Sequence, residues 1–121
     1  PSSGREEIIS NVIRTVTEAG AKACPPLILG IGLGANFETA PLLAKRALFQ
    51  DLEARNPVAY YAELEDEIKS RINSSGIGPM GMGGNCTVLA VHLLQAACHM
   101  ASLPLAVNLQ CHAFRHLGIR I

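Results

Sequence analysis

The chain contains no Trp and few aromatic residues, and its ten basic side chains are balanced by ten acidic ones. A net charge of zero, with only 17% charged residues, provides no basic surface for a phosphate backbone, so we expect no nucleic-acid partner. The longest apolar run, at 87–94, is interrupted by His92 and is too short to span a bilayer. We also expect no secretory leader. These absences predict a soluble, cytoplasmic protein without a membrane segment.

The cysteines do not form the closely spaced pairs that are typical of zinc sites. There are four of them, at positions Cys24, Cys86, Cys98 and Cys111. A disulfide framework is not expected, because 121 residues can bury a substantial core and intracellular thiols are normally reduced. Zinc bound by Cys111, His112 and His116 would lack the usual ligand spacing. Two alternatives stay open at this point: inert thiols, or an iron-sulfur cluster held by cysteines from distant loops.

Glycine and proline are abundant and lie mostly in two patches. The first patch begins with Cys24-Pro25-Pro26 and continues through the glycines of 30–34. The second patch, 75–86, has glycine at 76, 78, 81, 83 and 84 and ends in Cys86. Runs of glycine allow the backbone to approach a ligand or another segment closely. We therefore expect glycine-rich site loops around Cys24 and Cys86, whereas Cys98 lacks such a setting.

Hydrophobic spacing predicts three helices, at 4–19, at about 37–50 and from Pro57 to about 72. Ser3 and Glu6 have the form of a capping box before the first helix, and Asn36 can cap the second. The third helix has a charged face that includes Glu65 and Lys69, which we expect to be solvated.

The strands are predicted from apolar runs bounded by glycine and proline. A buried strand is expected from Leu27, ending in a glycine turn from Gly30 to Ala35. The run that begins at Thr87 is ambiguous between a strand and a buried helix, and its β-branched start favours a strand. The run 105–110 predicts a short strand that can pair with it. The chain is thus expected to form one domain, 1–121, with a mixed α/β (α+β) fold of helices packed on a small sheet.

The first glycine patch also permits a nucleotide-binding hypothesis. Gly30, Gly32 and Ala35 satisfy the G-x-G-x-x-A spacing, and Glu53 follows about twenty residues later. Gly34 is an additional glycine, and no second strand is visible before residue 86. A nucleotide-binding module that uses the turn from Gly30 to Ala35 stays an alternative, as does a structural fragment without activity.

Three motifs occur in order along nearly the whole chain. They are Cys24-Pro25-Pro26 with the glycines that follow, 76–92 with Cys86, and 99–116 with its Ser-Leu-Pro and Cys-His segments. Together they resemble the alpha subunit of the two-subunit class I fumarases and L-tartrate dehydratases. The chain looks like the C-terminal portion of that subunit, and we expect it to be inactive alone.

The resemblance implies a hydro-lyase that reversibly hydrates or dehydrates a small dicarboxylic hydroxyacid, fumarate/malate or tartrate. It implies a 4Fe-4S cluster bound by three cysteines, with Cys24 and Cys86 at matching positions and the third ligand outside this chain. It also implies a beta subunit or C-terminal domain as partner, a dicarboxylate substrate and an oligomeric enzyme. Ser74 stands where fused members carry a catalytic His, so the resemblance leaves the catalytic acid and base unknown.

Overall fold

The computed structural model describes residues 4–114 and 118–121, which form three α-helices, three strands and short 3-10 helices. This confirms the mixed α/β fold expected from the sequence. The elements, in chain order, are α1 (Arg5–Ala19), β1 (Leu27–Gly34), α2 (Thr39–Ala47), α3 (Ala59–Asn73), β2 (Val88–Ala96) and β3 (Leu105–Gln110). Among the described residues, no helix has both the length and the apolar character needed to cross a membrane.

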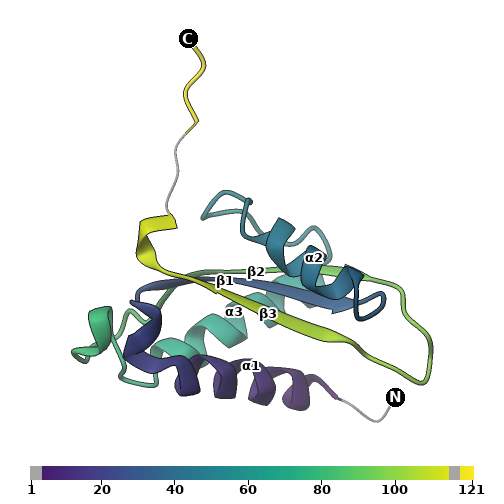
Figure 1. Cartoon of the computed structure of the whole chain (residues 1–121), viewed down its shortest axis with the longest axis horizontal. Coiled ribbons are helices and arrows are strands. Elements are labelled where there is room, and N and C mark those ends of the chain that lie inside the picture. Colours follow the sequence, from purple (N-terminus) through teal and green to yellow (C-terminus); the bar gives the residue numbers. More distant parts are fainter. Residues whose placement is uncertain (1–3, 115–117) are drawn as a thin grey trace.

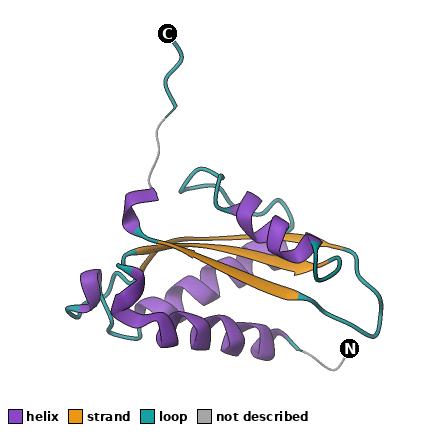
Figure 2. Ribbon diagram, in the orientation of Figure 1, coloured by secondary structure: helices purple, strands orange, loops and turns teal. Residues whose placement is uncertain are grey.

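The three strands form one sheet in the order β2-β1-β3 (Figure 2). β1 and β2 run parallel, whereas β3 is antiparallel to β1. The strand prediction for the run after Thr87 is confirmed, but the prediction that 105–110 pairs with that strand is wrong. β1 is the apolar strand whose residues are all buried, so it takes the centre and receives a neighbour on each side.

Helices cover both faces of the sheet: α1 and α3 lie on one face and α2 on the other (Figure 1). The larger core lies on the α1 and α3 side, and Leu29 and Ile31 of β1 contribute to it. The opposite face of β1 presents Gly30 and Gly32 to α2. A Cβ atom at these positions would lie 2.1 Å from Ala44 O and 2.0 Å from Ala40 O, respectively. The expected glycine turn is therefore wrong here, because both glycines lie inside the strand and admit the α2 backbone.

The helix boundaries depart from the sequence expectations at their starts. α2 spans Thr39–Ala47 and is shorter than predicted, although the Asn36 side chain does accept the N–H groups of Glu38 and Thr39, at 2.9 and 2.8 Å. α1 begins at Arg5 after Gly4 without a side-chain cap hydrogen bond, and Ser3 lies outside the described residues.

α3 begins at Ala59 rather than at Pro57. The Asn56 side chain is buried and donates to Leu93 O at 2.8 Å, so it joins this segment to β2 instead of only capping a helix.

Candidate functional site

Cys24 and Cys86 lie at the same end of the sheet, the end where β1 and β2 begin, because they precede these two adjacent parallel strands. The Leu27 N–H donates to Thr87 O at 2.8 Å, and Leu27 is the register partner of Val88. Cys24 stands shortly before the first of these strands and Cys86 shortly before the second. The structure thus places the two predicted site residues at one end of the molecule, where β1 and β2 begin.

The segment around Cys24 is a tight turn with an unusual backbone. Cys24 has φ 56° and ψ 62°, a left-handed conformation that non-glycine residues rarely adopt. Its N–H donates to Ala21 O at 3.1 Å, which closes a 3-10 helix at Gly20–Ala23. The peptide bond between Pro25 and Pro26 is cis. Non-glycine residues in the left-handed conformation are often found at functional sites, so the backbone of Cys24 supports a role for its half-buried thiol.

The second glycine patch folds back on itself. The Gly78 N–H donates to Thr87 Oγ1 at 3.1 Å, and the Gly83 N–H donates to Ile77 O at 2.8 Å. A Cβ atom at Gly78, which has φ 68°, would lie 1.9 Å from Gly83 O. Only glycine fits there. Gly81 and Met82 also donate to carbonyl oxygens within the loop, so its first part is held by its own hydrogen bonds.

This loop also packs against the Cys24 turn. The Met80 N–H donates to Pro25 O at 2.8 Å. A Cβ atom at Gly81 would lie 2.3 Å from the Cβ atom of Ala21. The close backbone approach predicted from the glycines is therefore present, and the segment approached is the turn that carries Cys24. The two cysteine-bearing loops form one packed unit.

The end of β3 reaches the same edge, which the sequence did not indicate. Gln110 is the register partner of Ile28, so Cys111 follows β3 beside the start of β1. The His112 ring Nδ1 lies 3.2 Å from Cys24 O. Only the antiparallel pairing of β3 with β1 brings these residues here, and that pairing has no local sequence signal. His116, the third member of the zinc hypothesis, lies outside the described residues.

Cys98 lies elsewhere, in the loop after the carboxyl end of β2. Its thiol donates to Ser102 O at 3.1 Å. The sequence distinction between Cys98 and the two loop cysteines therefore agrees with their placement at opposite ends of the sheet.

Within residues 4–114 and 118–121, no three Cys, His, Asp or Glu side chains are placed to hold a metal ion. A cluster at the Cys24 and Cys86 edge would therefore need a ligand from outside the described residues. Ser74 also lies before the glycine loop, at the end of α3, and its hydroxyl donates to Ser70 O at 2.9 Å. Its hydroxyl proton is thus engaged within its own helix.

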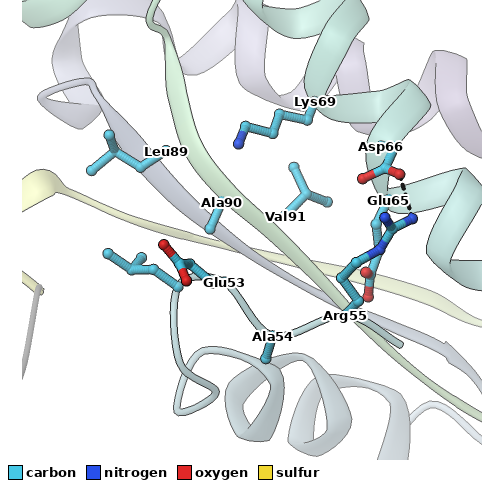
Figure 3. A pocket seen from close by; sticks show the side chains of 10 residues that line it. Glu53, Ala54, Arg55, Glu65, Asp66, Lys69, Leu89, Ala90 and Val91 are labelled. Carbon is cyan, nitrogen blue, oxygen red and sulfur yellow. Dashed lines mark hydrogen bonds and ion pairs between the residues drawn. The ribbon is translucent and has the colours of Figure 1, made fainter. Parts of the chain in front are cut away.

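The nucleotide-binding alternative does not fit the observed arrangement. Glu53, its expected ribose ligand, lines a cavity of about 410 Å³ at the outer edge of β2, beside Leu89 and Val91 (Figure 3). Val91 is level with Leu29 in β1, whereas Ala35 follows the far end of that strand. Six residues separate Leu29 from Ala35 in this strand direction. At about 3.3 Å per residue, Glu53 therefore lies roughly 20 Å along the sheet from the end of the glycine motif at Ala35.

One charged residue of α3 was placed wrongly by sequence reasoning. Glu65, expected on a solvated face, is only 3% exposed. Its carboxylate accepts the N–H groups of Leu93 at 2.9 Å and of Asn56 at 3.2 Å. Burial raises the pKa of Glu65, although these two hydrogen bonds oppose the shift. The contacts are structural, since they close the edge of β2, and no signal in the local sequence marks them.

Comparison with known proteins gives a consistent family assignment. The model of the family Fumarate hydratase (Fumerase) matches residues 1–120. A provisionally named L(+)-tartrate dehydratase subunit alpha of Methanocaldococcus jannaschii is 45% identical over 121 residues, which is 100% of this chain and 42% of that protein. The L(+)-tartrate dehydratase subunit alpha of Escherichia coli strain UTI89 is 35% identical over 121 residues, 100% of this chain and 40% of that protein.

The corresponding subunit of Escherichia coli strain K12 is 36% identical over 115 residues, 95% of this chain and 38% of that protein. The chain thus spans about two fifths of the length of the curated relatives it matches. Because the family model covers all but the last residue, the chain belongs to the fumarate hydratase (Fumerase) family.

Proposed function

We propose that this chain is part of the alpha subunit of an iron-sulfur hydro-lyase that reversibly hydrates or dehydrates a small dicarboxylic acid of the fumarate/malate or tartrate type. Family membership supports the reaction class. The names of the relatives support tartrate as a substrate and a beta subunit as a partner. The observation that carries the proposal is that Cys24 and Cys86 precede adjacent parallel strands at one end of the sheet, in loops joined by the hydrogen bond from Met80 N–H to Pro25 O.

The two thiols suit a 4Fe-4S cluster that this chain binds only in part. Cys24 and Cys86 are both free and half-buried. Thiolates are the protein ligands that iron-sulfur clusters use, whereas Mg²⁺ and Ca²⁺ prefer oxygen. In this proposal Cys24 and Cys86 are two of the ligands, and the third comes from the portion of the subunit outside this chain. Free thiols and a cluster also fit a cytoplasmic location.

The residues of this chain have a positioning role in the proposed reaction. When bound, a cluster with one open iron supplies a Lewis acid that polarises the carbon–oxygen bond of the substrate. The Ala21–Cys24 hydrogen bond and the two prolines hold the Cys24 backbone, and the packed glycine loop holds the segment that leads to Cys86. Elimination also needs a base for the C–H proton. Ser74 donates its hydroxyl to α3, so we place this base outside the chain.

The test compares cysteine variants of the whole alpha subunit, expressed with its beta subunit and reconstituted with iron and sulfide without oxygen. Cys24→Ser and Cys86→Ser should each lose most cluster absorbance. Activity should fall more than about a hundredfold, since changes in the second shell of metal sites already cost 10–100-fold. Cys98→Ser is the matched control, because a serine hydroxyl can still donate to Ser102 O.

Circular dichroism and thermal unfolding establish that each variant is folded. A Cys86→Ser enzyme that keeps its cluster and full dehydratase activity would contradict the ligand assignment. Loss of the cluster in Cys98→Ser to the same extent would contradict it as well.

A further inference from the structure

The two outer strands of the sheet, β2 and β3, differ in whether side chains bond to their outward-facing backbone groups. Along the outer edge of β2, Asn73 Oδ1 accepts the N–H groups of Thr87 and Val88, at 2.9 and 2.8 Å. Farther along the same edge, Glu65 accepts the Leu93 N–H at 2.9 Å and Asn56 donates to Leu93 O at 2.8 Å. Side chains thus take the place of a neighbouring strand at the start of β2 and again at Leu93. Covering an edge in this way prevents another strand from pairing there.

The outer edge of β3 lacks such a cover in the described residues, where β3 pairs with β1 alone. The Gly34 N–H donates to Pro104 O at 2.9 Å, which fixes the hydrogen-bonding phase of this antiparallel pair. Because backbone groups alternate in direction along a strand, the N–H and C=O groups of Leu105, Val107 and Leu109 point away from β1. Three donors and three acceptors therefore line this edge.

The side chains of the same three residues lie on the α1 side of the sheet. They are only half-buried, although they pack against the larger core. Two cavities lie next to Leu105 and Val107, between β3 and α1. The larger, about 350 Å³, is lined by Asn11, Arg14, Thr15, Leu105 and Val107, and the smaller, about 90 Å³, by Glu7, Ile8, Asn11, Leu103 and Leu105. The backbone edge and a partly apolar groove are thus continuous.

We propose that a strand from the part of the alpha subunit outside residues 1–121 pairs with the outer edge of β3. It forms main-chain hydrogen bonds with Leu105, Val107 and Leu109, and its alternate side chains enter the two cavities over α1. This proposal rests on the proposed function, in which the chain is part of a longer subunit. The matched region makes up 42% of the Methanocaldococcus jannaschii relative, so more than half of that protein is available to supply the strand.

An open edge with half-buried apolar side chains is also a hazard that folded proteins normally cover. The regular spacing of the outward-facing backbone groups along β3 matches a strand rather than a helix or a loop. Side chains of α3 bond to Thr87, Val88 and Leu93 along the β2 edge. In β3 the outward backbone groups recur at every second residue from Leu105 to Leu109.

The test is hydrogen exchange in the whole alpha subunit, purified without its cluster and resolved at single amides. The amides of Leu105, Val107 and Leu109 should exchange about a hundredfold or more slowly than unstructured amides, as paired strands do. Two threonines of α1 provide matched variants. Thr15 and Thr17 each donate to the carbonyl four residues earlier at 2.8 Å, but Thr15 lines the larger cavity and Thr17 is exposed.

Thr15→Lys should return the three amides to fast exchange, and Thr17→Lys should leave them protected. Fast exchange of these amides in the wild-type subunit would overturn the proposal without recourse to any variant. Protection that rises with subunit concentration would assign the edge to a second copy of the chain and would also overturn it. The exchange is measured without the cluster, so its outcome does not depend on whether Cys24 and Cys86 bind iron. The two proposals can therefore fail separately.

Discussion

The carboxylate of Glu65 on α3 accepts the backbone N–H of Leu93 on β2 at 2.9 Å. Its second oxygen accepts the N–H of Asn56 at 3.2 Å. One buried side chain therefore satisfies two backbone donors that the helix-to-strand packing would otherwise leave without partners. The charged face of α3 is thus divided, with Glu65 turned to the sheet edge and its neighbour Asp66 exposed.

Replacing Glu65 by alanine should destabilise the protein strongly. Each of the two N–H groups left without an acceptor costs about 1–3 kcal/mol when buried. Glu63→Ala is the control, because Glu63 is exposed on the same helix and should change the free energy of unfolding by less than about 0.5 kcal/mol. Urea unfolding of both variants measures the difference. Similar free energies of unfolding for the two variants would contradict the role given to Glu65.

The same carboxylate should make stability depend on pH. Burial raises the pKa of Glu65 in the folded protein above its ordinary value of 4.5. The folded state therefore holds this proton more tightly than the unfolded state does. Tighter proton binding by folded Glu65 adds to the free energy of unfolding. This contribution is complete below pH 4.5 and is lost as the pH rises through the raised pKa of the folded protein.

Glu65→Gln carries no titrating group, so its stability relative to wild type should improve as the pH rises through that interval. Thermal unfolding of both proteins across the interval measures this, and other groups cancel in the difference. A stability difference between Glu65→Gln and wild type that does not change with pH would contradict the raised pKa of Glu65.

The placement of the two candidate cysteines could be predicted because its signals are local. Cys24-Pro25-Pro26 and the glycine loop are contiguous motifs, and each precedes a strand that its β-branched and apolar residues make recognisable. Two such strands in parallel start at one edge, so placing both cysteines there requires only the correct pairing of β1 with β2.

The features that sequence reasoning missed depend on contacts between distant residues. Glu65 resembles any charged helix residue until Leu93, on another element, is placed beside it. The position of β3 next to β1 is likewise decided by which edge of the buried central strand is vacant. Gly30 and Gly32 match a phosphate-binding spacing, yet the same spacing puts both on the strand face that contacts α2. A local pattern does not distinguish these two uses of glycine.

Gly32→Ala should therefore loosen the contact between α2 and β1. The added Cβ would lie 2.0 Å from Ala40 O, and a helix backbone cannot yield as a flexible side chain would. We expect a loss of stability in the range of overpacked cores, about 1–3 kcal/mol or more. Gly118→Ala is the control, since no atom lies within 4 Å of a Cβ built there. The prediction is wrong if the two variants have equal unfolding midpoints in thermal denaturation.

The glycine loop offers a test that separates backbone strain from packing. Gly76 and Gly78 both have positive φ, 79° and 68°, so alanine is strained at either position, by roughly 1–2 kcal/mol. Only at Gly78 does the new Cβ also collide with the protein, at 1.9 Å from Gly83 O, whereas nothing lies within 4 Å at Gly76. Gly78→Ala should open the loop and speed hydrogen exchange at the Met80 amide, which bonds to Pro25 O.

If Cys24 and Cys86 bind the cluster together, Gly78→Ala should also weaken iron retention in the reconstituted subunit pair by at least about tenfold, as changes in supporting contacts at metal sites do. Gly76→Ala should leave most of the iron bound, because it strains the loop without displacing it from the Cys24 turn. Faster exchange at Met80 with unchanged iron retention would separate the loop from the cluster. In that case the packing of the two loops would serve the fold alone, since the scaffold would have opened without disturbing the ligands.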